Sequence, residues 1–382
     1  MARYSHISVA IPMLAEQQNL LPLLERFRQQ TFQHFTLYIC INNVEGGYGF
    51  EENQICLQEL KSVTDLPLNI IDRSSIGCGW SGKKKGVGWA RKVLFEQIIT
   101  EKDDDELVVS LDADTDFANN YLEALIATFN ADTSANAMAV PYYHPLNGNA
   151  QLDRPMLRYE CYMRHYLLNL FRIQSPYAFT ALGSAMAFPL WAYRRVGGIT
   201  PLQGGEDFYL LQKFAKTGKL INCMAPAYDN DSTVVRPQGR TSPRVPFGTG
   251  PAIAKGIAGM DVSYPFYSHT GFDAVLATYQ SFDHLYEKDE ETPMSEFLRK
   301  QLATDDLWGS LRLNFKTKDR FIHACSERVD GLRILQFLKN TAEYRLSTAE
   351  LPVDFVHDNI DTLNNYRDQL FAEEMRQRRS KH

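Results

Sequence analysis

The chain has 382 residues, of which 44% are hydrophobic and 23% are charged, and its formal net charge is −6. A chain of this length can bury a full core, either as one large domain or as one domain with a smaller appendage. The acidic balance argues against broad nucleic-acid binding. No run of about 18 apolar residues is present, so we expect no transmembrane helix.

The six cysteines are scattered and form no Cys-x-x-Cys pair. This spacing favours reduced thiols, as in cytoplasmic enzymes, over a disulfide framework. The first residues contain no apolar core typical of a signal peptide. We therefore expect a cytoplasmic protein. The basic end of the chain, Arg376–His382, leaves peripheral contact with the inner membrane face open.

Apolar runs typical of strands alternate with segments of helical spacing through the first two-thirds of the chain. Together they predict strands at Ile7–Ile11, Thr36–Ile41, Leu68–Ile71, Glu106–Leu111, Ala137–Val140 and Ser184–Phe188. The predicted helices are Glu16–Gln30, Gly86–Ile99, Asn119–Asn130, Leu152–Phe171, Leu190–Val196 and Gly205–Thr217. This order predicts an α/β fold with a mainly parallel sheet flanked by helices. Asp229–Pro251 is irregular, and the pattern from about Gly271 onward is helical.

Two carboxylates, Asp112 and Asp114, directly follow the apolar run Leu107–Leu111. We expect both at the carboxyl end of a buried strand, which is the edge of an open α/β sheet where ligands bind. Hard oxygen ligands suit Mg²⁺ or Mn²⁺, and such an ion would hold a substrate diphosphate. Turn or helix capping is the simpler alternative for such a short motif.

A calcium loop is a second alternative, because Asp112, Asp114, Asp116 and Glu123 match four of its ligand positions. Phe117 stands where that loop needs glycine, and the preceding segment is typical of a strand instead of a helix.

In its motifs the chain resembles a family 2 glycosyltransferase of the GT-A fold over about residues 5–225. The matching pieces, in chain order, are Ser8–Pro12 with Glu16, Gly86–Arg91, Asp112–Asp114, Ser184–Phe188 with Arg194–Ile199, and Gly205–Phe208. The resemblance implies a Rossmann-like GT-A fold for the core, and we place this domain at residues 1–270. The helical pattern of the rest of the sequence, which the resemblance does not cover, predicts a mainly helical C-terminal region over residues 271–382. One departure is Asn42-Asn43, where the family often has an acidic pair that contacts the nucleotide base.

The resemblance also implies roles for individual residues. Asp114 would be the direct metal ligand, and Asp112 would contact the ribose or a water bound to the metal. Asp207 would be the general base, and Glu206 would orient the acceptor or Asp207. A helix-dipole effect on two first-turn acids is the alternative for this pair. His269 is a further metal-ligand candidate. The donor-binding candidates are Pro12, Glu16, Asn42, Asp72, Arg73, Lys83, Arg91 and Asp112.

Lys83 lies in a glycine-rich basic loop, Gly77–Gly86, which lacks the ending of a P-loop. Three arginines, Arg236, Arg240 and Arg244, occur in the irregular stretch and would close over a diphosphate or lie in solvent. The aromatic residues of the middle segment are expected mostly in the core.

The function that we expect is an inverting, metal-dependent transfer of a sugar from a nucleoside-diphosphate donor, UDP-linked by expectation, to an acceptor hydroxyl. The acceptor would be a glycan, a lipid-linked sugar or a small molecule, and polysaccharide or glycolipid assembly is compatible with the family. A sugar-phosphate nucleotidyltransferase is one rival, although Ile11–Ala15 lacks its glycine-rich basic signature. A non-catalytic metal-binding scaffold on a transferase-like core is the other.

Overall fold

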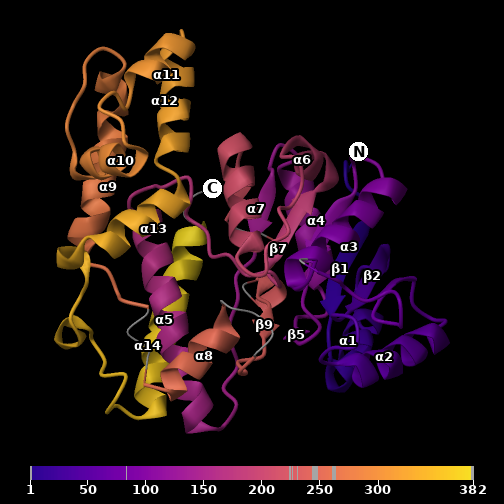
Figure 1. Ribbon diagram of the computed structural model, residues 1–382. Helices are drawn as coiled ribbons and strands as arrows, with labels where there is room; N and C mark the ends of the chain where they lie inside the picture. Colours follow the sequence, from indigo (N-terminus) through magenta and orange to yellow (C-terminus); the bar gives the residue numbers. More distant parts are fainter. Residues whose placement is uncertain are drawn as a thin grey trace. The chain divides into compact units, whose positions relative to one another are not determined.

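The computed structural model describes residues 2–82, 84–222, 225, 227–229, 231–242, 248–259 and 264–379 (Figure 1). The chain divides into two compact units. The first comprises Met1–Met156, Thr180–Met260 and Arg378–His382, and the second comprises Leu157–Phe179 and Asp261–Gln377. The domain boundary expected at residue 270 stays a prediction.

The first unit is built on a seven-stranded sheet with the strand order β3-β2-β1-β4-β7-β6-β8. These strands are β1 (Ile7–Met13), β2 (Phe35–Asn42), β3 (Leu68–Arg73), β4 (Leu107–Ser110), β6 (Ala137–Ala139), β7 (Met186–Pro189) and β8 (Leu220–Ile221). Strands β1 to β4 are parallel, β7 is antiparallel to both of its neighbours, and β8 is parallel to β6. The predicted α/β fold, with a mainly parallel sheet, is confirmed.

Helices flank this sheet, and α1 (Gln17–Arg28) shows how an apolar stripe packs a helix against it (Figure 1). In α1, Leu20, Leu23, Leu24 and Phe27 are buried at helical spacing. The other helices of this unit are α2 (Phe50–Ser62), α3 (Val87–Glu101), α4 (Tyr121–Ala131), α6 (Leu190–Arg195), α7 (Glu206–Thr217) and α8 (Thr249–Ile257). Two of them differ from expectation: α2 was not predicted, and α8 begins inside the stretch that was expected to be irregular.

The acidic motif leaves the sheet at the carboxyl end of β4. The β1–β4 pairing runs from Ile7↔Leu107 to Ala10↔Ser110, and the Leu111 amide donates to the Ala10 carbonyl at 3.1 Å. The chain then turns into β5 (Thr115–Asp116), which pairs antiparallel with β9 (Arg236–Pro237). This two-stranded sheet brings the segment after β9 to the acidic motif.

The second unit is helical, as the sequence predicts for the C-terminal region. Helix α5 (Ala150–Arg172) enters it from the first unit. Its other helices are α9 (His269–Leu285), α10 (Pro293–Leu302), α11 (Gly309–Asn314), α12 (Lys318–Arg328), α13 (Gly331–Asn340) and most of α14 (Ile360–Arg379). Within the described residues, no helix combines the length and the apolar character that crossing a bilayer would require.

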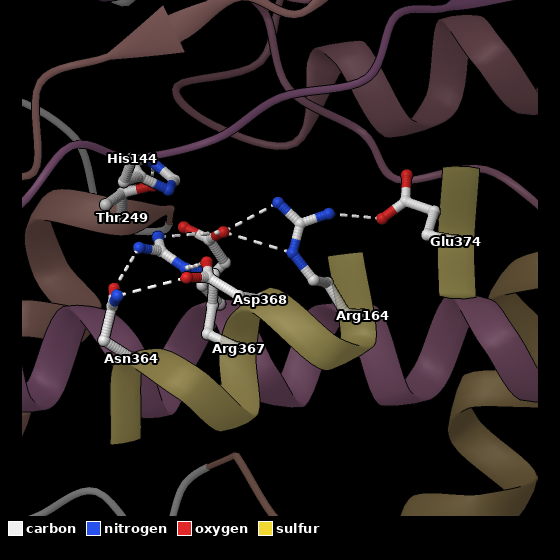
Figure 2. Close-up of polar contacts among 8 residues, drawn as sticks. His144, Arg164, Thr249, Asn364, Arg367, Asp368 and Glu374 are labelled. Carbon is white, nitrogen blue, oxygen red and sulfur yellow. Dashed lines mark hydrogen bonds and ion pairs between the residues drawn. The ribbon is translucent and has the colours of Figure 1, made fainter. Parts of the chain in front are cut away.

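A buried network of charges joins α5 to α14 inside this unit (Figure 2). Arg164 donates to Glu160 at 2.7 Å and pairs with Glu374, and all three side chains are fully buried. Arg367 also donates to Glu160, at 3.4 Å. The two arginines and two glutamates offset each other's charge, which is what allows so many ionised groups to lie out of water.

Candidate active site

Arg91, in the second turn of α3, joins two motifs that are far apart in the sequence. Its side chain is 3% exposed, its Nη2 donates to Asp112 Oδ1 at 2.5 Å, and its Nη1 pairs with Glu206 Oε1. The structure therefore brings together three of the predicted site residues: one from α3, one from the turn after β4 and one from the start of α7.

The backbone around Arg91 is shaped to admit the guanidinium. A Cβ atom on Gly183 would lie 1.9 Å from Arg91 Nη2, so only glycine leaves room there. Ser110 holds this glycine in place by donating to its carbonyl at 2.7 Å. Gly88 in α3 instead makes room for the backbone at Leu202, because a Cβ there would lie 2.2 Å from the Leu202 carbonyl oxygen.

Two opposing effects determine the pKa values of Arg91 and Glu206: burial disfavours a charged side chain, and the opposite charge of the partner favours it. Burial disfavours the charge on Arg91, but Asp112 and Glu206 outweigh it and raise the pKa of the guanidinium. Burial raises the pKa of Glu206, and the positive charge of Arg91 opposes that rise. Contact with the guanidinium thus offsets part of the cost of burying the Glu206 carboxylate.

Asp207 lies beside Glu206 in the first turn of α7 and does not share the contact with Arg91. Gly205, with φ of 79°, precedes the helix, and Asp207 Oδ1 accepts from the Phe208 amide at 2.8 Å. Burial raises the pKa of Asp207, Arg91 and the Phe208 amide lower it, and Asp112 raises it further. The two acids thus differ: Glu206 is fixed by Arg91, whereas Asp207 is a partly buried carboxyl with a raised pKa.

A second arginine, Arg240, lies between the carboxylates of Glu16 and Asp114. Its Nε donates to Asp114 Oδ2 at 2.9 Å, its Nη2 lies 2.8 Å from the same oxygen, and Nη2 also pairs with Glu16 Oε1. Burial and repulsion by Asp112 raise the pKa of Asp114 to about 6, and Arg240 opposes that rise. Asp114 and Glu16 are therefore arranged to share one cation.

This arrangement fits the predicted divalent ion. The Arg240 guanidinium is a stand-in cation, and the oxygens that it contacts are the hard carboxylate donors that Mg²⁺ and Mn²⁺ prefer. In the part of the chain that the structure describes, no three His, Cys, Asp or Glu side chains form a complete metal site by themselves. Asp114 and Asp112 would hold the ion together with substrate oxygens and water, as is usual for Mg²⁺.

Glu16 is positioned by a short network that the sequence did not suggest. Ala15, before it, has a φ of 52°, and its amide donates to Asn53 Oδ1 of α2 at 2.9 Å. Asn19 Nδ2 donates to Glu16 Oε2 at 2.5 Å, and Gln238 Nε2 donates to Asn19 Oδ1 at 3.1 Å. The unpredicted helix α2 thus supports the turn that carries Glu16.

The predicted base-binding residues lie at the ends of β2 and β3. Asn42 is buried, with Nδ2 donating to Met13 O at 3.0 Å and Oδ1 accepting from Trp80 Nε1 at 3.3 Å, so its amide already binds the chain. Asp72 accepts from the amides of Ser74 and Ser75. The exposed Arg73 lies 5.5 Å from the Trp80 ring centroid. Contact of these residues with a base stays a prediction.

A cavity of about 550 Å³ opens between the loop after β2 and the turn after β3. Glu45, Gly49, Phe50, Glu52 and Ile76 are among its lining residues. Glu45 accepts from the amides of Gly77 and Gly79, at 2.9 and 3.0 Å, which fixes the turn against the loop. The cavity is a concave space that follows the ends of these two strands, at the same edge of the sheet as the acids.

The remaining predicted residues are less informative. Pro12 is buried within β1, opposite Cys40. Lys83 lies outside the described residues, and so does Arg244. His269 is the exposed first residue of α9 in the second unit, where its ring stacks on His165 with centroids 6.4 Å apart. Its role as a metal ligand stays a prediction.

The four acids of the alternative calcium loop have separate partners. Asp112 pairs with Arg91, and Asp114 pairs with Arg240. Asp116 pairs with Arg26 at 2.5 Å, and Glu123 accepts from Thr31 Oγ1 at 2.5 Å. Asp116 belongs to β5 and Glu123 to α4, so they are not held in one loop. The local structure therefore disfavours calcium-loop binding.

Comparisons with known proteins give weak structural likenesses. No family model matches the chain, and no curated protein matches its sequence. Among solved structures, TarS residues 1–349 of S. aureus, in complex with UDP-GlcNAc, has 12% identity and a TM-score of 0.43, with 98% of this chain and 91% of that chain covered. The mannosyltransferase PcManGT of Pyrobaculum calidifontis, in complex with GDP-Man and Mn²⁺, has 12% identity and a TM-score of 0.40, with 99% and 88% covered.

Proposed function

We propose that the chain is an inverting, metal-dependent glycosyltransferase of family 2 type, which transfers a sugar from a nucleoside-diphosphate donor to an acceptor hydroxyl. The contact of Arg91 with both Asp112 and Glu206 carries the proposal, because it holds the acids expected at the donor beside the acids expected at the acceptor. A transferase needs both groups within reach of one anomeric carbon.

On the donor side, Asp114 and Asp112 would bind a Mg²⁺ or Mn²⁺ ion together with the diphosphate. Such an ion supplies Lewis-acid stabilisation of the charge that develops on the leaving diphosphate. The nucleoside would lie toward the ends of β2 and β3, where Asp72, Arg73 and the cavity are found. Three glutamates that line the cavity, Glu45, Glu51 and Glu52, disfavour phosphate there. We therefore place the diphosphate nearer Arg240 and Arg91.

On the acceptor side, Asp207 would accept the proton of the attacking hydroxyl. A raised pKa suits this role, because a general base works best when its pKa is close to the operating pH. Glu206 is held by Arg91 and would orient Asp207 and the acceptor. A single base acting on the face opposite the leaving group inverts the anomeric centre.

We take UDP-linked sugars as the first donor class to examine and glycans, lipid-linked sugars and small molecules as acceptors. Binding is tested by thermal denaturation with UDP, GDP and Mn²⁺, singly and in pairs. A rise in Tm that needs both a nucleotide and Mn²⁺ is expected. Stabilisation by a divalent ion that no nucleotide changes would instead favour a metal-binding scaffold.

A further inference from the structure

The segment that presents Arg240 is fastened to the acidic motif by its own backbone and side chains. We call it the Arg240 strap and define it as residues 236–240. Pro237 pairs with Thr115 in the small sheet, the Gln238 amide donates to the Asp114 carbonyl at 3.3 Å, and Asn147 Nδ2 donates to the Gly239 carbonyl at 2.8 Å. Hydrogen bonds on both sides of the Arg240 strap therefore hold the Arg240 side chain beside the acids.

The guanidinium lies where a divalent ion shared by Glu16 and Asp114 would lie. Asp114 Oδ2 accepts a hydrogen bond from Arg240 Nε and lies 2.8 Å from Nη2, and Nη2 donates to Glu16 Oε1. The exposed fractions of the side chains are 25% for Arg240, 16% for Asp114 and 6% for Glu16. Two ionised carboxylates that share one guanidinium and are this poorly hydrated repel each other unless a cation lies between or beside them.

We propose that Arg240 is a tethered cation that occupies the carboxylates of Glu16 and Asp114 until a divalent ion displaces it. The inference rests on the proposed function, and it adds a residue that competes with the ion. A guanidinium and a divalent ion cannot bind the same carboxylate oxygens at once, so each weakens the binding of the other.

Displacement also changes what Arg240 can do. Once released from Asp114, a guanidinium on the strap is an unpaired cation beside the expected diphosphate, and its planar donors match phosphate oxygens. Metal binding and diphosphate binding would then favour each other through one side chain. The divalent ion would therefore bind tightly only when a donor is also bound.

The inference is tested by titrating Mn²⁺ into the full chain without nucleotide and following free Mn²⁺ by electron paramagnetic resonance. We compare the wild type with Arg240→Gln, which keeps a polar side chain but removes the charge. We expect Arg240→Gln to bind Mn²⁺ about tenfold more tightly or more, which corresponds to about 1.4 kcal/mol. Equal or weaker Mn²⁺ binding by Arg240→Gln would overturn the inference, and so would absence of Mn²⁺ binding in both proteins.

Two further variants separate direct competition from a general effect of charge. Arg26→Gln also removes one positive charge, here from the exposed pair that Arg26 forms with Asp116, two residues after Asp114. Because an exposed pair contributes little, the Mn²⁺ affinity of this variant should stay within about twofold of the wild type. Asp114→Asn should abolish the gain when combined with Arg240→Gln. A gain of equal size in Arg26→Gln, or a gain that survives Asp114→Asn, would contradict displacement at this site.

Thermal denaturation provides a readout that needs neither nucleotide nor turnover. Without Mn²⁺, Arg240→Gln leaves Glu16 and Asp114 to repel each other, so its Tm should be below that of the wild type. Addition of Mn²⁺ should raise the Tm of Arg240→Gln more than that of the wild type. If these results are obtained but no nucleotide sugar reacts, the proposed function fails and the tethered cation stands. If a nucleotide sugar is turned over but Arg240→Gln leaves the metal affinity unchanged, the tethered cation fails and the proposed function stands.

Discussion

The guanidinium of Arg91 binds the carboxylate of Glu206 across 115 residues of sequence. Both side chains are almost completely buried, at 3% and 2% exposure. A buried ion pair of this kind adds little net stability compared with an apolar pair of the same shape, but losing one partner is costly. The pair is therefore best explained by what it positions: Asp112 on one side and Asp207 on the other.

Replacing Arg91 with Gln should destabilise the chain strongly. The change leaves Glu206 buried without its cation, so we expect a loss of about 3–5 kcal/mol in the free energy of unfolding. Urea denaturation followed by circular dichroism measures this. The matched control is Arg28→Gln, because Arg28 pairs with Asp65 at 2.6 Å on the surface, and its removal should leave the free energy of unfolding nearly unchanged.

The double variant Arg91→Gln with Glu206→Gln completes a thermodynamic cycle with the two single variants. It removes both charges, so it should be more stable than Arg91→Gln alone. A double variant whose loss equals the sum of the two single losses would show that Arg91 and Glu206 are not coupled.

Gly183→Ala should damage the same contact from the backbone. Its Cβ would meet the Arg91 guanidinium at 1.9–2.4 Å, and Arg91 cannot move away without breaking its contacts with Asp112 and Glu206. We expect a loss of about 2 kcal/mol or more in unfolding free energy, together with reduced turnover.

Gly148→Ala is the comparison, because it adds only backbone strain at a φ of 73° with no atom near its Cβ. It should cost about 1 kcal/mol and leave turnover unchanged. Equal effects of the two alanines on turnover would argue against a special role for Gly183.

The acid limb of the pH–rate profile should reflect protonation of the Asp207 carboxylate. Burial raises the pKa of this carboxyl in the folded protein, so the ionised form that can act as a base is lost at a higher pH than for an ordinary aspartate. The rate should fall as pH decreases through this raised pKa. In Arg91→Gln the nearby positive charge is absent, so the acid limb should move to higher pH. An acid limb at the same pH in both proteins would remove Asp207 and Arg91 from this role.

The buried network in the second unit gives a prediction that is independent of activity. Arg164→Met removes the shared partner of Glu160 and Glu374, both fully buried, and should cost about 3–5 kcal/mol (Figure 2). Arg376→Met, in α14, breaks only the exposed pair with Glu373 at 2.5 Å and should cost about 1 kcal/mol or less. Thermal denaturation of the two variants should separate them clearly, and similar melting temperatures would contradict the buried network.

The sequence predicted most of the sheet because its strands are continuous apolar runs, as in Leu107–Ser110, where all four residues are buried. It missed α2, where only Cys56, Leu57 and Leu60 provide buried apolar side chains on an otherwise polar segment. The direction of β7 was not predictable, because a four-residue strand with both faces buried has no pattern that distinguishes parallel from antiparallel pairing.

The sequence predicted the candidate carboxylates that directly follow a strand or begin a helix, which are Asp112, Asp114, Glu206 and Asp207; their catalytic roles stay predictions. Contacts that depend on the tertiary fold were not predicted. Arg240 was one of three arginines in an irregular stretch, and its pairing with Asp114 depends on the short β5–β9 ladder. Nothing local to Gly183 indicates that its missing side chain makes room for Arg91.

The central claim is that these acids transfer a sugar from a nucleotide-sugar donor. Its most direct test is the release of nucleoside diphosphate from a panel of nucleotide sugars, measured with Mn²⁺ and without acceptor. The proteins compared are the wild type, Asp114→Asn and Asp207→Asn, with Arg28→Gln as the control. We predict slow hydrolysis of one donor by the wild type and Arg28→Gln, and a loss of about a hundredfold or more in both aspartate variants. Absence of release from every donor, or release that Asp114→Asn and Asp207→Asn leave unchanged, would contradict the proposed transfer.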